Sequence, residues 1–271
     1  MDLSSIVQLF ERFHDYILAT AFALARVAGL IIVMPAFTRI GLTGILRGAT
    51  GLAFALPLVP MMAAAIAGLP LTITTVAALL LKEVIIGLVI GVVLGVPIWA
   101  AEVAGDVLDL QRGSTAASLV DPLATTEESI TGTLFGLVMV ALYFGFGGLR
   151  LTLRTVYDSY AIWPAASVLP TFSPAASQLF LALLDNVVSM GLVLVAPIVV
   201  FMLLADLLLA LVSRAAPHLN VFALMLSLKN LIFALLLVLY GGFLIKYMGT
   251  DLGSLLRAGS SLETLGKPSS P

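Results

Sequence analysis

The chain has 271 residues, of which 61% are hydrophobic and 10% are charged, and its formal net charge is −2. Soluble domains carry roughly 25% charged residues, so this composition excludes a water-exposed globular surface and indicates an integral membrane protein or a subunit of a hydrophobic assembly. The lack of cysteine excludes disulfides and thiolate metal sites, and the charge gives no electrostatic basis for binding nucleic acid.

Residues 1–16 contain three acidic side chains and one arginine, without a basic segment followed by a small-residue cleavage site. We therefore expect no removable signal peptide. Ile6, Leu9, Phe10 and Phe13 recur at helical spacing. This segment is either an amphipathic interfacial helix or an early extension of the first membrane helix.

Six mostly apolar stretches are candidate membrane helices, which need about 17–25 residues. They are Ile17–Met34, Ala49–Ile66, Val84–Ala101, Ile130–Phe146, Val187–Val212 and Leu231–Ile245. Backbone groups in hydrocarbon must pair within their own segment, so the predicted fold class is all-α. Apolar residues precede the third stretch from near Leu71, so it is either one kinked helix or a half-length helix leading into a full one.

Four charged residues interrupt these stretches. Inserting an arginine such as Arg26 at mid-helix into a membrane costs roughly 2.5–3.5 kcal/mol, and insertion of the surrounding apolar residues roughly offsets this cost. Arg26 therefore either faces a protein partner or snorkels to an interface. Lys82 and Glu83 are adjacent, and neighbours on a helix do not face each other. They either lie at a helix end or meet different partners. Asp206 is a candidate to pair with Arg26, with Lys82 or with another chain.

Gly87, Gly91 and Gly95 recur at every fourth position of the third stretch. This spacing puts them on one helix face, where another backbone can approach closely. Gly132 and Gly136 repeat the spacing in the fourth stretch. The glycines therefore predict a packed helical bundle.

The rest of the chain divides around these stretches. Between Gly147 and Asp185 we expect an interfacial helix followed by a proline-broken loop, and Pro197 should kink the fifth stretch. Residues 1–248 are predicted to form a single helical domain. Residues 249–271 are predicted to form a polar, flexible tail.

The segment Gly105–Pro122, GDVLDLQRGSTAASLVDP, is polar although it lies between membrane-grade stretches. Its glycines and Pro122 favour a loop. Asp106 and Asp109 would share one helix face and could bind a cation, although a solvated or partner-contacting edge is the commoner outcome. The two histidines have no metal-binding spacing, so we expect no cofactor, no metal and no catalytic residues.

Together these features resemble the SctT/FliR family of type III secretion export-gate subunits over essentially the whole chain. The residues that carry the resemblance are Lys82-Glu83 with Gly87 and Gly91, the motif at 105–122, Ser129, and SRAAPHLNVF at 213–222. The second motif is represented by Arg214, Pro217, Asn220 and Phe222. The segment Asp109–Gly113 resembles the injectisome branch more than the flagellar branch.

The resemblance implies a non-enzymatic subunit that joins smaller hydrophobic export-gate subunits in a helical hetero-oligomeric ring around the protein-export channel. It further implies contacts with other type III secretion membrane components, lipid and unfolded protein substrates in transit. The implied location is the bacterial inner membrane, raised toward the periplasm. Such a location would explain why the charged loops of this chain give no clear orientation by the positive-inside rule.

In the resembling family the segment matching 105–122 is a channel plug. The implied plug residues are Asp109, Leu110, Gln111, Arg112, Gly113, Ser114, Thr115, Ala116, Ala117, Ser118, Leu119, Asp121 and Pro122. Glycine and serine give the flexibility that a movable plug needs, while an ordinary connector between helices is the simpler alternative. The alternative function is a self-contained secondary transporter in which Arg26, Lys82, Glu83 and Asp206 form an ion relay.

Overall fold

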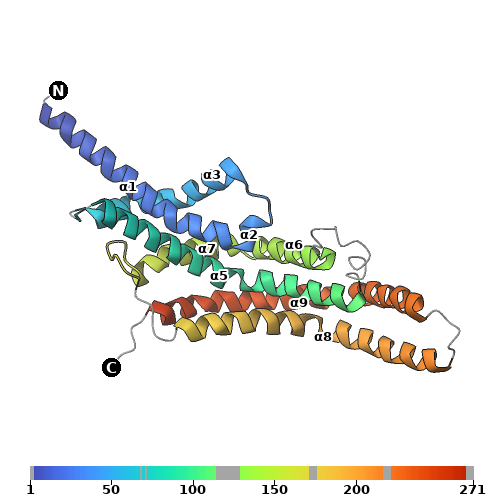
Figure 1. Cartoon of the computed structure of the whole chain (residues 1–271). Coiled ribbons are helices and arrows are strands. Elements are labelled where there is room, and N and C mark those ends of the chain that lie inside the picture. Colours follow the sequence, from blue (N-terminus) through green and yellow to red (C-terminus); the bar gives the residue numbers. More distant parts are fainter. Residues whose placement is uncertain are drawn as a thin grey trace. The chain divides into compact units, whose positions relative to one another are not determined.

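The structure, a computed structural model, describes residues 3–67, 69–70, 72–113, 129–170, 176–215 and 221–266 (Figure 1). Every element in these ranges is helical, which confirms the predicted all-α class. The elements are α1 (Leu3–Val33), α2 (Pro35–Thr38), α3 (Gly44–Ala55), the 3-10 helix η1 (Leu56–Leu58), α4 (Val59–Ile66), α5 (Ile73–Arg112), α6 (Ile130–Gly145), α7 (Gly148–Ile162), α8 (Ala176–Ala215) and α9 (Val221–Gly266).

Within the described residues, five helical segments are long and apolar enough to cross a membrane. They are Phe13–Val33, Gly44–Ile66, Ile73–Arg112, Phe180–Ala215 and Leu224–Thr250. The helices α6 and α7 form a sixth only if this bent pair counts as one span. The predicted spans therefore occupy the observed helices, although several of their bounds differ.

The third predicted stretch belongs to one continuous helix, drawn from teal to green in Figure 1. The helix α5 has 40 residues and contains Pro97 in its interior. Of the two alternatives left open by the sequence, the single long helix is the one observed. Buried side chains occur along α5 from Leu79 to Asp109. Packing contacts therefore stabilise both halves of this long helix.

The structure corrects the start of the predicted loop at 105–122. Gly105–Arg112 is helical and forms the end of α5. Gly105 does not break the helix because it lies against α6, where an added Cβ would be 2.4 Å from the Cα atom of Gly132. The helix ends at Arg112 and is followed by Gly113, whose φ of +78° is a conformation that favours glycine after a helix C-terminus. Residues 114–122 lie outside the described residues.

The last two predicted stretches begin later than the helices that contain them. The helix α8 begins at Ala176 rather than at Val187, and α9 begins at Val221 rather than at Leu231 and extends to Gly266, past the predicted tail boundary at Gly249. A hydropathy pattern predicts only the apolar part of a helix, which can lie in the hydrocarbon core of a membrane. Polar residues such as Asp185 and Asn186 lower hydropathy without stopping an α-helix.

The chain divides into two compact units. The first contains Met1–Gly95, Gly147–Ala182 and Leu255–Pro271. Its core includes Phe22, Leu30, Ile31, Met62 and Ile86, all almost completely buried, and α1 packs on α3 and α4.

The first half of α5 packs closely on α1 within this unit. A Cβ added at Gly87 would lie 1.9 Å from the carbonyl oxygen of Arg26, and one at Gly29 would lie 2.4 Å from that of Val84. Gly91 lies similarly against Leu30. The two backbones therefore touch at positions that only glycine can occupy.

The second unit contains Val96–Phe146 and Leu183–Ser254. Its α6 packs on the end of α5, and α8 approaches α5 at Gly191, where an added Cβ would be 2.8 Å from the carbonyl oxygen of Ala100. Large apolar side chains remain exposed on α8 and α9. They include Leu203, Leu204, Leu207, Leu208, Leu211, Leu231, Leu235, Val238 and Leu239.

Candidate functional site

A fully buried charge cluster holds three elements of the first unit together. The Arg26 Nε of α1 donates to Glu83 Oε2 of α5 at 2.6 Å, and Lys82 Nζ lies 2.8 Å from Glu83 Oε1. The side chains of Arg26, Lys82 and Glu83 are at most 1% exposed. One carboxylate therefore serves two cations.

The residues around α7 supply the remaining acceptors of this cluster. Arg26 donates to Ser159 Oγ at 2.7 Å and to the carbonyl oxygen of Trp163 at 3.1 Å, and its guanidinium lies 3.5 Å from the centre of the Tyr160 ring. Lys82 Nζ donates to the carbonyl oxygens of Pro164 and Ala165, both at 3.0 Å. These oxygens lie just beyond the C-terminus of α7. The C-terminal end of a helix carries partial negative charge and therefore stabilises nearby cations.

Of the two alternatives for Lys82 and Glu83, different partners are the one observed, because Glu83 meets Arg26 and Lys82 meets the Pro164 and Ala165 carbonyl oxygens. Both lie inside α5 rather than at a helix end, and they contact each other as well as other elements. Neighbouring positions point in different directions on a helix, but the flexible lysine side chain is long enough to reach back to the adjacent carboxylate. Arg26 does not snorkel, because its bonding groups meet Glu83, Ser159 and Trp163 within the first unit.

A second polar network lies in the second unit and joins the end of α5 to the start of α6. The buried carboxylate of Asp109 accepts hydrogen bonds from Ser129 Oγ at 2.8 Å and from Thr131 through both its backbone N–H, at 3.0 Å, and its hydroxyl. Arg112 Nη2 lies 2.7 Å from Asp109 Oδ1. Ser129 also caps α6, because its Oγ accepts from the Gly132 N–H. Asp109 thus ties the end of α5 to the start of α6.

This arrangement separates the two aspartates that the sequence suggested as a cation-binding pair. Asp109 is 3% exposed, whereas Asp106 is exposed on the same helix. The Asp109 oxygens already accept hydrogen bonds from Ser129 and Thr131 and an ion pair from Arg112. Among the described residues, no three His, Cys, Asp or Glu side chains gather closely enough to hold a metal ion.

A further ion pair links α8 to α9 in the same unit. Lys229 Nζ lies 2.8 Å from Asp206 Oδ1 and donates to the carbonyl oxygen of Gln111 at 2.9 Å, while the Gln111 side chain donates to Asp206 at 3.4 Å. The sequence offered Arg26, Lys82 or another chain as the partner of Asp206, and the partner observed is instead Lys229 of the same chain. The partner was missed because Lys229 precedes the predicted sixth span, whereas α9 already includes it.

Arg112 completes this second network. Its guanidinium lies 4.7 Å from the centre of the Phe233 ring on α9, in addition to its ion pair with Asp109. The network therefore joins α5, α6, α8 and α9 around the last turn of α5. Leu110, in the same turn, is 67% exposed and takes no part in the core.

The other predicted site residues are distributed as follows. Ser114, Thr115, Ala116, Ala117, Ser118, Leu119, Asp121 and Pro122 of the predicted plug lie outside the described residues, as do Pro217 and Asn220 of the second motif. Arg214 is exposed in the last turn of α8, and Phe222 belongs to α9. Gly95 lies within α5 at the end of the first unit's range.

Sequence reasoning missed Ser159, Tyr160, Trp163, Thr131 and Lys229. For Lys229 a signal was present, because a lysine close to an apolar stretch needs an acidic partner. Trp163, Pro164 and Ala165 act through backbone carbonyl oxygens. Side-chain patterns give no sign of such acceptors.

Comparison with known proteins places this arrangement in a family. The family model described as bacterial export proteins, family 1, matches residues 17–255. Yop proteins translocation protein T of Yersinia pestis is 40% identical over 166 residues, which cover 61% of this chain and 64% of that protein, or slightly less than two thirds of its length.

Two longer matches have lower identity. Surface presentation of antigens protein SpaR of Salmonella typhimurium is 29% identical over 233 residues, which cover 86% of each chain. Flagellar biosynthetic protein FliR of Caulobacter vibrioides is 27% identical over 210 residues, or 78% of this chain and 82% of the relative. Because the family match includes both polar networks and nearly all the described helices, the chain belongs to the bacterial export proteins, family 1.

Proposed function

We propose that this chain is a non-enzymatic subunit of a type III secretion export apparatus, where it helps to form and plug the protein-export channel of the inner membrane. The observation that carries the proposal is the family match over residues 17–255. The names of the relatives, which refer to translocation and to flagellar biosynthesis, agree with it.

An injectisome is the favoured setting. Identity is 40% to the Yersinia translocation protein and 27% to the Caulobacter flagellar protein, although the first value comes from a shorter segment. The motif at Asp109–Gly113 supports the same branch. We further propose that the gate is raised from the inner membrane toward the periplasm.

The proposed partners are smaller hydrophobic export-gate subunits in a hetero-oligomeric ring, together with other membrane components of the secretion system. The exposed apolar side chains of α8 and α9 support this assignment, because large exposed apolar patches mark protein or membrane contacts. The buried Arg26 of α1 and the buried Lys82 and Glu83 of α5, by contrast, have partners within the chain. Apolar packing would therefore be the main source of cohesion in the ring.

The proposed plug is the segment Gly105–Pro122, whose residues up to Gly113 are described. Its support is the way Asp109 ties the end of α5 to Ser129 and Thr131 at the start of α6. A plug must leave the channel when an unfolded substrate arrives and must then return to the same place. The contacts of Asp109 with Ser129 and Thr131 would keep the end of α5 and the start of α6 together during such a cycle.

Deleting Ser114–Leu119 tests the plug. This deletion spares Gln111 and Arg112, which contact α8 and α9, so a defect in the second unit's core would not be mistaken for loss of the plug. We expect the assembled complex to be recovered and its ion conductance in planar bilayers to rise. A matched variant, Ser114→Ala with Ser118→Ala, keeps the segment length and should conduct as the parent does.

Different results would contradict the plug and the subunit assignment. Unchanged conductance of the assembled deletion variant would overturn the plug and leave the subunit assignment in place. Isolation of the parent chain from its native membrane as a monomer, without smaller hydrophobic partners, would overturn the subunit assignment itself.

The alternative hypothesis of a self-contained transporter required one relay through four charged residues. Arg26, Lys82 and Glu83 form a single cluster in the first unit, whereas Asp206 pairs with Lys229 in the second. The geometry therefore gives this alternative no specific support.

A further inference from the structure

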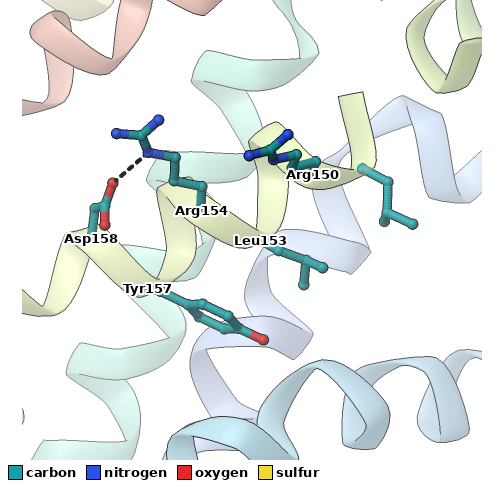
Figure 2. Close-up of a pocket in the computed structure, with 6 residues that line it drawn as sticks. Arg150, Leu153, Arg154, Tyr157 and Asp158 are labelled. Carbon is teal, nitrogen blue, oxygen red and sulfur yellow. Dashed lines mark hydrogen bonds and ion pairs between the residues drawn. The ribbon is translucent and has the colours of Figure 1, made fainter. Parts of the chain in front are cut away.

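The helix α7 carries a surface groove opposite the face that contacts the Arg26 cluster. The groove has a volume of about 490 Å³ and is lined by Leu149, Arg150, Leu153, Arg154, Tyr157 and Asp158 (Figure 2). Ligand pockets in proteins commonly have volumes of roughly 300–1,000 Å³. The groove is thus large enough for a small ligand or a lipid headgroup.

Two arginines one helical turn apart give this groove its charge. Figure 2 shows the guanidinium groups of Arg150 and Arg154 extending along the same side of α7, with Arg154 turned toward Asp158. Arg154 Nε lies 3.3 Å from Asp158 Oδ2, and both side chains are mostly exposed. No hydrogen bond or ion pair of Arg150 is found among the described residues. The two arginines and one aspartate leave a net charge of +1.

The groove also has an apolar wall that is held in place. Leu153 and Tyr157 leave α7 beside the arginines (Figure 2), and the Tyr157 hydroxyl donates to the carbonyl oxygen of Phe54 in α3 at 3.1 Å. On the opposite face of α7, Ser159 and Tyr160 contact the buried guanidinium of Arg26. The helix that carries the groove is therefore held in place by the contacts of Ser159 and Tyr160 with Arg26.

From this combination we propose that the α7 groove binds the headgroup of an anionic phospholipid. The phosphate accepts hydrogen bonds from Arg150 and from the terminal nitrogens of Arg154, because a guanidinium matches the geometry of phosphate oxygens. The glycerol backbone and upper acyl chain cover Leu149, Leu153 and the Tyr157 ring. A basic face beside exposed leucines is the pattern of helices that lie at membrane surfaces.

The charge of the groove selects among lipids. Asp158 is already paired with Arg154, so one positive charge remains for the ligand. A lipid with net charge −1, such as phosphatidylglycerol, neutralises it, whereas zwitterionic phosphatidylcholine does not. The inference concerns a lipid contact of the first unit and does not depend on the plug or on the export function.

The test is native mass spectrometry of the full-length chain taken from nanodiscs that contain phosphatidylglycerol and phosphatidylcholine in equal amounts. The parent chain should retain phosphatidylglycerol preferentially. A basic residue near an anionic surface contributes about 1 kcal/mol, or about fivefold in affinity. Arg150→Gln should therefore reduce retention about fivefold, and Arg150→Gln with Arg154→Gln up to about 30-fold.

Two matched variants identify the cause. Lys246→Gln removes an exposed cation of α9 and should retain phosphatidylglycerol as the parent does. Arg150→Lys with Arg154→Lys keeps the charge but loses the forked geometry, and should retain an intermediate amount. Circular dichroism spectra that match the parent's confirm that the variants are folded.

Three results would overturn the proposal. The first is equal retention of phosphatidylglycerol by the parent and the doubly substituted chain. The second is displacement of the lipid by glycerol phosphate at similar concentration, which would indicate a soluble phosphate ligand. The third is a crosslink from position 150 to an acidic segment of a protein partner in the assembled complex.

Discussion

The two polar networks differ in how charge is balanced and how far it is buried. In the first unit, Glu83 serves both Arg26 and Lys82, and all three side chains are at most 1% exposed. In the second, Asp109 pairs with Arg112 and Asp206 with Lys229, one acid to each base. The Asp206 side chain is 27% exposed, so this pair keeps partial access to the surroundings.

This difference indicates different roles. A buried cluster with one anion for two cations is intolerant of losing that anion, because the cost of an unpaired buried charge is high. One-to-one pairs at partly exposed positions are weaker and can be exchanged for other partners. We interpret the first network as a permanent joint between α1, α5 and α7. In the second network we interpret the partly exposed Asp206–Lys229 pair as exchangeable, whereas the buried Asp109 keeps the end of α5 tied to α6.

The largest effect should come from Glu83→Gln. This substitution leaves Arg26 and Lys82 without their shared anion, and breaking a buried ion pair costs about 3–5 kcal/mol. We expect a large fall in the yield of folded chain and in its thermal unfolding midpoint in detergent. Replacing all three charged residues by methionine should recover part of that loss, because no unpaired charge would remain.

If the triple methionine variant were less stable than Glu83→Gln, the loss could not be assigned to unpaired charge. A smaller loss for Glu83→Gln than for substitutions in the second network would remove the contrast between the two regions. Both comparisons require the same detergent and the same measurement of unfolding.

Asp109→Asn should have an intermediate effect. Hydrogen bonds to charged groups contribute about 1.5–3 kcal/mol, and this carboxylate accepts from Ser129 and Thr131 beside Arg112. We expect a stability loss of about 2 kcal/mol and faster amide hydrogen exchange at the Thr131 N–H. Asp106→Asn changes an exposed side chain one turn earlier in α5 and should leave that exchange rate unchanged. Equal exchange in both variants would count against the proposed tie between α5 and α6.

The smallest effect on the isolated chain is expected for Asp206→Leu. The Asp206–Lys229 pair is partly exposed, so the loss should be about 1 kcal/mol. Recovery of the assembled complex should fall more than the unfolding midpoint does. Exchanging the pair, as Asp206→Lys with Lys229→Asp, should restore only part of the stability, because an aspartate at position 229 cannot donate to the Gln111 carbonyl oxygen. Full recovery of complex from Asp206→Leu would exclude a role in assembly.

The fold could be predicted well from the sequence because apolar runs and backbone pairing determine membrane-type helices. The structure of the end of α5 could not be predicted from the sequence. Gly105, Asp106 and Asp109 look like loop residues, yet Gly105 is needed for contact with Gly132, and Asp109 is satisfied by Ser129 and Thr131. Local signals were overridden by contacts with α6, which lies beyond segment 114–128.

The charged residues of the candidate site were recognised from the sequence, but most of their partners were not. Arg26 and Glu83 are 57 residues apart, and Arg26 and Ser159 are 133 apart. Hydropathy identifies a charge that needs a partner but carries no information about which distant element supplies it. The backbone oxygens of Trp163, Pro164 and Ala165 could be found only from coordinates.

The long sequence separation within the Arg26 cluster has a consequence for synthesis. At about 5–20 residues per second, the 133 residues between Arg26 and Ser159 take roughly 7–27 s to translate. Until then α1 contains an arginine whose insertion costs roughly 2.5–3.5 kcal/mol without its final partners. The first helix therefore cannot reach its final environment when it is made, and must wait for α5 and α7 before its position becomes permanent.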